Sequence, residues 1–393
     1  MKAIVYHGVG DIRLDDVPRP SIQAPNDAIV RLTASAICGT DLHFVRGTMA
    51  GTKEGRILGH EGVGVVEEIG EHVRNVQPGD RVVIPSTIAC GTCSYCRAGY
   101  YAQCDNANPK GPGTAFFGGP EDAGGFDGLQ AEYARVPYAN VGLVRIPDEV
   151  SDDQAILLSD IFPTGYMAAD IAEIGEGDVV CVLGCGPVGQ FAIWSALHFG
   201  AGRVIAVDSV PDRLAMAREG GAEVVDFRRE DPVEMVKAMT RGIGPDRVID
   251  AVGVDANRAP DAGTAESEAI PQSTHDGGNG RTWQAGTEPT QAVRWAVEMV
   301  AKAGTVSLIG VYPPDVTGFP IGAAFMKNLT ITMGNCNHRK YIPHLMELVR
   351  AGTVDPTRLI ARQEPLTSAT EAFEAFDRRE PGWLKVELAP VAR

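Results

Sequence analysis

Four cysteines lie within a segment of fifteen residues, at Cys90, Cys93, Cys96 and Cys104. Four thiolates close a tetrahedral shell around Zn²⁺ and leave no position for a substrate, so this spacing predicts a structural zinc site. An iron–sulfur cluster also uses four cysteines, but the ferredoxin pattern has three residues before its last cysteine and a proline after it. Here seven residues precede Cys104 and Asp105 follows it, which favours zinc.

A glycine motif formed by Gly184, Gly186 and Gly189 follows a strand-like run and opens a helix-like segment. The first glycine permits a tight turn, the second lets the backbone approach a pyrophosphate, and the third lets helix and strand pack closely. The pyrophosphate would lie at the helix N-terminus, where unpaired N–H groups favour an anion. The motif therefore predicts a dinucleotide site.

Asp208 lies 19 positions after Gly189, at the end of the next strand-like run. At a spacing of about 20 residues, a carboxylate binds the adenosine ribose hydroxyls of NAD. It would also repel the 2′-phosphate of NADP, so the pattern predicts NAD. The alternative is that Asp208 is only a turn residue at the end of a strand.

A third set of reactive side chains is scattered along the chain. Sequence spacing cannot bring its members together, and the run 38–43 (CGTDLH) taken alone suits an ordinary loop. A single histidine is also more often structural than a metal ligand. The set consists of Cys38, Thr40, Asp41, His43, His60, Glu61 and Asp160.

Two kinds of sequence texture predict the elements that must position these residues. The first 150 residues have short alternating apolar stretches separated by turn signals, which indicates a mainly antiparallel β domain. Six strand-like runs follow, the first four separated by helix-length segments, which predicts a parallel sheet covered on both faces and a doubly wound α/β domain. These runs are 178–184, 203–208, 223–227, 246–253, 305–311 and 329–335.

Residues 254–290 interrupt this pattern, because they are polar, rich in Gly, Thr and Ser, and lack periodicity. Such a stretch is either a functional lid or a disordered surface loop. The last residues return to helical texture and end in a strand-like tail that we expect to rejoin the first domain. We therefore expect a catalytic domain at 1–161, a dinucleotide domain at 162–336 and a return to the catalytic domain at 337–393.

Length and charge limit the classes of function. A chain of 393 residues suggests two domains. No apolar run approaches the roughly 20 residues that span a bilayer, and the first residues lack a signal-peptide pattern, so we expect a cytoplasmic protein. A formal net charge of −16 argues against nucleic acid and anionic membranes as partners. Clustered cysteines in a cytoplasmic chain indicate a metal site rather than disulfides.

Several motifs in a fixed order resemble the zinc-containing medium-chain alcohol dehydrogenase family over essentially the whole chain. The resemblance implies a GroES-like catalytic domain and a Rossmann coenzyme domain. Within the family, the run 157–169 (LLSDIFPTGYMAA) and the long insertion are most similar to the formaldehyde dehydrogenase and formaldehyde dismutase branch. The family motifs are CGTDLH (38–43), GHEGVGVVEEIG (59–70), PGDRVVIP (78–85), CGTCSYCRAGYYAQC (90–104) and LGCGPVGQ (183–190).

The resemblance implies that Cys38 and His60 ligate a catalytic zinc. Most members supply a cysteine as third ligand, and Asp160 stands at that position here, as in the formaldehyde dehydrogenase branch. A Cys/His/Asp set with one open position suits a catalytic zinc. The alternative is that Asp160 caps the helix that begins near Pro163.

Four neighbouring residues take auxiliary roles in the family. Glu61 lies behind the metal and can swing in as a transient ligand, and Asp41 holds the ligand histidine by its other ring nitrogen. Thr40 hydrogen-bonds the substrate oxygen, and His43 ends the relay that passes the proton to solvent. The alternatives are a surface position for Glu61 and a merely structural role for His43.

The resemblance also assigns contacts with the cofactor. Lys385 is expected at the pyrophosphate, whereas Cys181, Cys185 and Cys336 match no ligand position and are expected to be packing residues. The expected cofactor contacts are Gly184, Gly186, Pro187, Val188, Gly189, Asp208, Arg213, Thr164, Val252, Ile309, Val311 and Lys385.

The expected enzyme transfers a hydride between NAD and a small alcohol or aldehyde, with formaldehyde favoured, and holds one catalytic and one structural zinc. Two alternatives are a formaldehyde dehydrogenase that acts on a glutathione adduct and a broader secondary-alcohol or polyol dehydrogenase. A different class is a nucleotide-binding scaffold without turnover. The resemblance further implies a homodimer or homotetramer, and an insertion that slows NAD release and permits aldehyde dismutation.

Overall fold

The computed structural model describes residues 1–109, 111, 113–257, 283 and 286–390. Most of the expected insertion at 254–290 lies outside these residues. The chain divides into two compact units. Of the described residues, the first unit takes those within 1–163, residue 283 and 336–390, and the second takes 164–257 and 286–335. The division after Pro163 and before Cys336 separates the mainly β sequence from the alternating strand and helix sequence.

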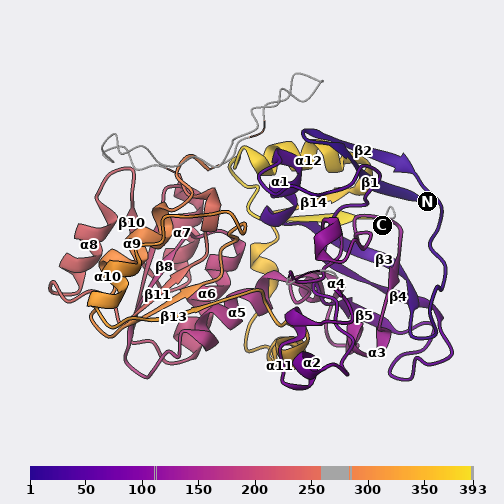
Figure 1. Ribbon diagram of the computed structural model, residues 1–393, viewed down its shortest axis with the longest axis horizontal. Coiled ribbons are helices and arrows are strands. Elements are labelled where there is room, and N and C mark those ends of the chain that lie inside the picture. The colour runs from indigo at the N-terminus through magenta and orange to yellow at the C-terminus, as the bar shows by residue number, and fades with distance from the viewer. Residues whose placement is uncertain (110, 112, 258–282, 284–285, 391–393) are drawn as a thin grey trace. The chain divides into compact units, whose positions relative to one another are not determined.

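The described part of the first unit is built on β-structure (Figure 1). A seven-stranded sheet has the order β14-β15-β3-β4-β5-β7, with β6 paired to β3, and its pairs are antiparallel except for β14 with β15. Strands β1 and β2 form a separate antiparallel pair. The bounds are β1 Lys2–Gly8, β2 Asp11–Asp16, β3 Ala28–Ile37, β4 Gly62–Ile69, β5 Arg81–Ile84, β6 Tyr133–Val136, β7 Val144–Arg145, β14 Arg362–Pro365 and β15 Val386–Ala389.

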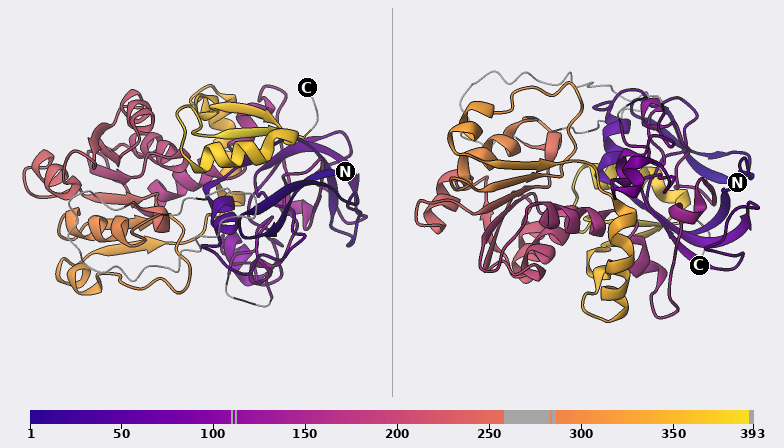
Figure 2. Two further views of the ribbon diagram at one scale, coloured as in Figure 1. Left: turned by 90° about the horizontal axis from the view of Figure 1, so that it is seen from above. Right: turned by 60° about the horizontal axis from the view of Figure 1, so that its bottom comes forward.

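Helices of 4 to 13 residues cover parts of this unit. Helix α12 packs against β14 and β15, as Figure 2 shows. A buried ion pair of 2.7 Å between Arg46 and Asp377 joins α1 to α12. The bounds are α1 Gly39–Arg46, α2 Ser94–Arg97, α3 Ala139–Gly142, α4 Asp152–Ile156, α11 His338–Arg350 and α12 Ala369–Asp377.

The tail of the chain completes the first unit. Strand β15 pairs antiparallel with β3, so that Val386 lies opposite Ile37 and Leu388 opposite Ser35. The strand-like tail therefore rejoins the N-terminal sheet, as its sequence predicts. The next residue along β3 is Cys38, at the N-cap of α1, so this sheet also fixes the position of a candidate ligand.

The second unit contains a six-stranded sheet of entirely parallel strands in the part of the chain that the structure describes. Its order, β10-β9-β8-β11-β12-β13, is that of a complete doubly wound dinucleotide fold. All six strand-like runs of the sequence are confirmed. The strands are β8 Val179–Leu183, β9 Arg203–Asp208, β10 Glu223–Asp226, β11 Arg247–Asp250, β12 Thr305–Leu308 and β13 Thr330–Met333.

Helices cover both faces of this sheet (Figures 1 and 2). Alternate residues of one strand point to opposite faces, so Cys181 packs with α8 and α9 while Val182 packs with α5, α6 and α7. This two-sided burial explains why the strands are almost continuously apolar. The helices are α5 Ile161–Ile171, α6 Pro187–His198, α7 Pro211–Glu219, α8 Pro232–Met239, α9 Gln291–Met299 and α10 Ile321–Met326.

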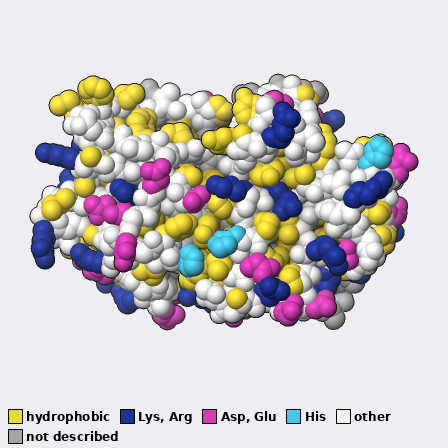
Figure 3. All heavy atoms as spheres, turned by 90° about the horizontal axis from the view of Figure 1, so that it is seen from below, with side chains coloured by type: hydrophobic (Ala, Val, Ile, Leu, Met, Phe, Trp, Pro, Cys, Tyr) yellow, Lys and Arg dark blue, Asp and Glu magenta, His cyan; other side chains and the backbone are white. Residues whose placement is uncertain are grey.

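The described helices and surface add two observations. Within the described residues, none of the helices has both the length and the apolar character needed to cross a membrane. On the face drawn in Figure 3, acidic and basic side chains are interspersed and neither sign forms a continuous block. The excess of negative charge is therefore not gathered into one patch on this face.

Candidate active site and metal centres

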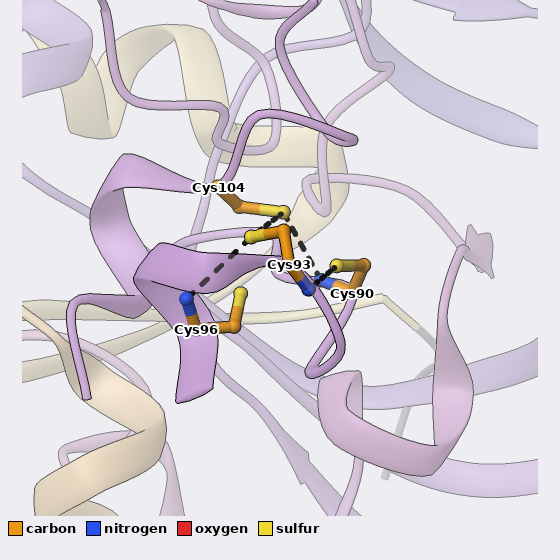
Figure 4. A group of neighbouring side chains, drawn as sticks. All are labelled: Cys90, Cys93, Cys96 and Cys104. Atoms are coloured by element: carbon orange, nitrogen blue, oxygen red, sulfur yellow. Dashed lines mark hydrogen bonds between the residues drawn. The ribbon is translucent and has the colours of Figure 1, made fainter. Parts of the chain in front are cut away.

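The four-cysteine cluster lies at α2, with Cys93 as the N-cap of this helix and Cys96 within it (Figure 4). The four Sγ atoms lie within 4.8 Å of one another. The N–H groups of Thr92 and Cys93 each donate to Cys90 Sγ at 3.3 Å, and the N–H of Cys90 donates to Cys104 Sγ at 3.2 Å. Short turns thus bring the four sulfur atoms together and direct backbone N–H groups toward two of them, Cys90 Sγ and Cys104 Sγ.

The chemistry of this cluster suits zinc. Burial raises the pKa of the Cys90 thiol, but hydrogen bonds from Thr92 and from backbone N–H groups outweigh burial and bring that pKa to about 6. A thiolate is the form that binds metal. Four sulfur ligands complete a tetrahedral shell and leave no open position, so the site is suited to structural zinc.

A second cluster brings together Cys38, His60, Glu61 and Asp160, whose ligand atoms lie within 4.8 Å of one another. Three parts of the first unit supply them. Cys38 is the N-cap of α1, His60 and Glu61 directly precede β4, and Asp160 directly precedes α5. All four side chains are buried. The structure therefore assembles the ligands that sequence spacing alone could not connect.

Asp160 lies at the centre of the second cluster. Its Oδ2 is 3.5 Å from Cys38 Sγ and 3.4 Å from His60 Nε2. Burial raises the pKa of a carboxyl, but hydrogen bonds from His338 and His60 outweigh burial and hold the pKa of Asp160 well below its usual range. An ionised carboxylate beside a thiol and an imidazole is a suitable set of metal ligands.

Asp41 supports the ligand histidine from α1. Its Oδ1 lies 3.1 Å from His60 Nδ1, and neither atom has another hydrogen-bond partner in the described part of the chain. Its Oδ2 accepts the N–H of Cys38 at 3.0 Å and the side-chain amide of Gln130 at 3.1 Å. The carboxylate thus orients one ligand and fixes the backbone of another.

Glu61 is fully buried, which contradicts the alternative of a surface glutamate. Its Oε1 accepts a hydrogen bond of 2.5 Å from Lys385 Nζ, while its Oε2 has no partner among the described residues. Burial outweighs the charge of Lys385 and raises the pKa of Glu61 to about 7. An unpartnered buried oxygen within the metal cluster agrees with a role as an additional ligand.

The position of Lys385 differs from the one expected from the sequence, which was beside a pyrophosphate. The side chain is 1% exposed, and Nζ donates to Glu61 and to the carbonyl of Ile37 at 3.0 Å. Burial lowers the pKa of Lys385, but the charge of Glu61 outweighs it and the pKa is raised. A buried ammonium that is already paired with a carboxylate is not presented to a phosphate, so the structure places Lys385 with the metal cluster.

Thr40 and His43 both lie on α1. Thr40 is partly exposed, whereas His43 is buried. The Nδ1 atom of His43 lies 3.0 Å from the hydroxyl of Thr48, in the turn that ends α1. The expected relay residues therefore belong to the same helix as Cys38.

Sequence reasoning missed His338 and Thr87. His338 begins α11, and its Nε2 lies 2.7 Å from Asp160 Oδ1. Its Nδ1 lies 3.2 Å from the hydroxyl of Thr87. Asp160 and His338 are 178 positions apart in the chain, so spacing gave no signal. One signal was available, because a buried carboxylate that replaces a thiolate ligand has a second oxygen that needs a partner.

The glycine motif has the geometry that a dinucleotide requires. Gly184 has a φ of 87°, in the left-handed region, and directly follows β8. A side chain at Gly189 would place Cβ only 1.8 Å from the carbonyl oxygen of Gly184, so α6 approaches the loop too closely for any other residue. Gly186 is the N-cap of α6, and Pro187 and Val188 form the first turn. The α6 N-terminus is therefore available to a phosphate.

Asp208 ends β9 beside this loop. Its carboxylate accepts the N–H of Cys185 at 2.7 Å, of Ser209 at 2.6 Å and of Val210 at 2.9 Å. These contacts are those of a strand-end turn, and they also join Asp208 to the glycine loop. The side chain of Arg213, on α7, lies 3.8 Å from where a Cβ on Gly186 would stand.

The other expected cofactor contacts of the second unit gather at the carboxyl edge of the sheet. The N–H of Val252 donates to Asp250 Oδ1 after β11, and Ile309 and Val311 follow β12. A Cβ on Gly184 would stand 2.5 Å from a methyl group of Val252, so this residue adjoins the glycine loop. Thr164 lies on α5. The side chains of Cys181, Cys185 and Cys336 are buried, which is consistent with packing roles for Cys181 and Cys185, whereas Cys336 also hydrogen-bonds to His338.

Two family models match the chain. Residues 24–148 match the alcohol dehydrogenase GroES-like domain, and residues 187–262 match the zinc-binding dehydrogenase. An uncharacterised zinc-type alcohol dehydrogenase-like protein of Bacillus subtilis, AdhB, is 39% identical over 99% of this chain and 100% of its own length. The chain belongs to the zinc-type medium-chain alcohol dehydrogenase family.

Two further relatives of this alcohol dehydrogenase-like oxidoreductase are informative. The solved alcohol dehydrogenase TADH from Thermus sp. ATN1 is 35% identical with a TM-score of 0.83, covering 99% of each chain. The glutathione-independent formaldehyde dehydrogenase of Pseudomonas aeruginosa is 34% identical over 85% of this chain and 80% of its own length. The GroES-like and Rossmann folds expected from the sequence are thus confirmed.

Proposed function

We propose that this protein transfers a hydride between NAD and a small alcohol or hydrated aldehyde of the formaldehyde type. The main support is the convergence of Cys38, His60 and Asp160 in one buried cluster. Three ligands with a fourth position open to substrate is the arrangement of a catalytic zinc, whereas the four-cysteine cluster is closed.

The residues present fit zinc at this position. They offer a thiol, an imidazole and a carboxylate, and the unpartnered Oε2 of Glu61 provides a further oxygen. When bound, zinc supplies a Lewis acid that polarises a substrate oxygen. Asp41 keeps the ring of His60 in place. Lys385 balances the charge of Glu61 while that carboxylate is not bound to the metal.

The proposed path of the substrate proton uses α1. The hydroxyl of Thr40 would accept the proton that leaves the alcohol oxygen while it gives its own proton, by way of the nicotinamide ribose, to His43, the next base toward solvent. His43 is buried, and its Nδ1 contacts Thr48, which is partly exposed. We therefore extend the expected relay by one residue, with Thr48 as its contact with water.

The proposed cofactor is NAD. The pyrophosphate binds at the N-terminus of α6, formed by Gly186, Pro187 and Val188, with Arg213 beside it. Oδ1 of Asp208 accepts two of its three backbone contacts and Oδ2 accepts the third, so Oδ2 keeps one lone pair with which to bind the ribose, and the charge of Asp208 disfavours NADP. Thr164 and the backbone of the residues at the carboxyl edge, Val252, Ile309 and Val311, position the nicotinamide for hydride transfer.

Three observations support a formaldehyde-type substrate and the expected cellular context. Asp160 replaces the cysteine ligand, and a formaldehyde dehydrogenase is among the similar proteins. The described cysteines are free, which suits the reducing cytoplasm.

The proposed enzyme is a cytoplasmic homodimer or homotetramer. Its insertion, which lies mostly outside the described residues, is proposed to slow NAD release and so to permit dismutation.

Metal analysis combined with NADH absorbance tests this function. The purified protein should contain two zincs per chain and reduce NAD with formaldehyde or a small alcohol in the absence of glutathione. Activity that requires glutathione would transfer the assignment to the adduct, and faster turnover of secondary alcohols or polyols would indicate a broader dehydrogenase. One zinc per chain with no reduction of NAD or NADP would contradict the proposal and favour a nucleotide-binding scaffold.

A further inference from the structure

We propose that His338 is a positioning residue for the third metal ligand, holding Oδ1 of Asp160 so that Oδ2 alone faces Cys38 and His60. This inference rests on the proposed metal site of the dehydrogenase. It assigns a role to a residue outside the four ligand candidates, from a segment that no motif of the sequence marks.

The two oxygens of Asp160 face different partners. Oδ2 lies 3.4 Å from His60 Nε2 and 3.5 Å from Cys38 Sγ, on the side of the ligand cluster. Oδ1 lies 2.7 Å from His338 Nε2. A carboxylate can only accept hydrogen bonds, so Nε2 of His338 carries the proton and donates it to Oδ1.

Thr87 fixes the ring of His338 from the opposite side. Its hydroxyl lies 3.2 Å from His338 Nδ1, and both side chains are buried. Contacts at both ring nitrogens determine the plane of the imidazole and so the direction of its Nε2–H. The same arrangement recurs across the cluster, where Asp41 contacts the outer nitrogen of His60. Asp160 and His60 are thus each held by a neighbouring side chain at the atom that faces away from the other ligands.

The need for His338 follows from the chemistry of the third ligand. A cysteine binds metal through one atom and has no second donor to satisfy. An aspartate has two oxygens, and a free buried carboxylate can rotate, bind through both oxygens, or leave one oxygen unpaired at a cost in free energy. A hydrogen bond to Oδ1 removes these alternatives and leaves a single oxygen for the metal.

His338→Leu removes the donor and tests the inference through metal binding. We expect a 10- to 100-fold loss of zinc affinity at the catalytic cluster, measured by competition with a chelating dye, because loss of such a supporting contact typically has this size. Co²⁺ bound at the same cluster should show a changed visible spectrum. The zinc of the four-cysteine cluster is an internal reference that should be retained.

Two further variants separate positioning from general packing. His338→Gln keeps a side-chain N–H near the position of Nε2 and should restore most of the affinity. His344→Leu makes the same apolar change at an exposed position of the same helix and should leave the affinity and the Co²⁺ spectrum unchanged. Equal losses in His338→Gln and His338→Leu would contradict a role through the hydrogen bond.

A double substitution gives the sharpest test. In an Asp160→Cys background the ligand has no second oxygen, so His338→Leu should change zinc affinity by no more than about threefold, although it costs 10- to 100-fold beside Asp160. Equal losses in both backgrounds, or unchanged affinity and spectrum in His338→Leu alone, would overturn the inference. A wild-type protein that binds both zincs but lacks turnover would contradict the proposed function without touching this result.

Discussion

The two metal clusters differ in how the chain builds them. The four cysteines lie on one short segment around α2, and Cys90 and Cys104 are 14 positions apart. In the second cluster, Cys38 and Asp160 are 122 positions apart and are brought together only by the packing of the first unit. Local turns are enough for the first cluster, whereas the second depends on tertiary packing.

The difference extends to the chemistry. The first cluster consists of identical sulfur ligands supported mainly by backbone N–H groups. The second mixes sulfur, nitrogen and oxygen donors, and its supports are the charged or polar side chains of Asp41, Lys385 and His338. A closed set of thiolates stabilises a fold, while a mixed, incomplete set that relies on distant side chains is suited to reaction.

The largest expected effect is that of Asp160→Ala, which disrupts the second cluster and leaves the four-cysteine cluster intact. We expect turnover to fall by about a thousandfold, which corresponds to roughly 4 kcal/mol of activation barrier, because the second cluster loses its third ligand. Zinc content should fall from two to one per chain, as measured by elemental analysis. Asp148→Ala, at an exposed position of the same unit, is the control and should keep both zincs and full activity. Wild-type turnover in Asp160→Ala would remove this residue from the mechanism.

Cys104→Ser should have the opposite consequence. We expect loss of the structural zinc and of roughly 4 kcal/mol or more of unfolding free energy, since loss of a metal is among the most destabilising changes. At a temperature where the variant is still folded, the second cluster should retain its zinc, and the enzyme should retain most of its turnover. Thermal unfolding, zinc content and NADH formation measure the three quantities. Parallel loss of both zincs would show that the clusters are not independent.

The glycine motif offers a third comparison, between two substitutions three residues apart. Gly189→Ala would place Cβ 1.8 Å from a carbonyl oxygen and should reduce both stability and NAD binding. Gly186 has a φ of −67°, and a Cβ there would make only an ordinary contact of 3.8 Å with Arg213, so Gly186→Ala should leave the melting temperature unchanged. It should still weaken NAD about tenfold, or 1.4 kcal/mol, because the methyl group occupies the approach of the pyrophosphate. Unaltered NADH affinity, measured by fluorescence, would place the cofactor elsewhere.

The smallest effect concerns the choice of cofactor. Asp208→Asn removes the charge beside the glycine loop while keeping the size of the side chain. We expect the preference for NAD over NADP to fall about tenfold, or 1.4 kcal/mol, because the repulsion of the 2′-phosphate is lost. The measurement is the ratio of kcat/KM for the two cofactors, with melting temperature as the control. An unchanged ratio would leave Asp208 with only the turn contacts that the structure shows.

Much of the fold was predictable from local patterns. The six strands of the parallel sheet alternate with helices and are almost continuously apolar, because both faces are buried. The four cysteines and the glycine motif need only short turns to form their sites. The chain by itself therefore determined the doubly wound sheet, the four-cysteine cluster and the dinucleotide loop.

Only the tertiary structure decided which distant side chains meet. Asp160 could have been a helix cap, Lys385 was expected at a pyrophosphate, and His338 belonged to no motif. The packed sheet and the return of the tail through β15 bring these residues to one buried cluster. Burial then makes their pairing obligatory, because an ionised group without water must find a partner within the protein. Sequence spacing contains no information on such contacts, since they depend on the path of the whole chain.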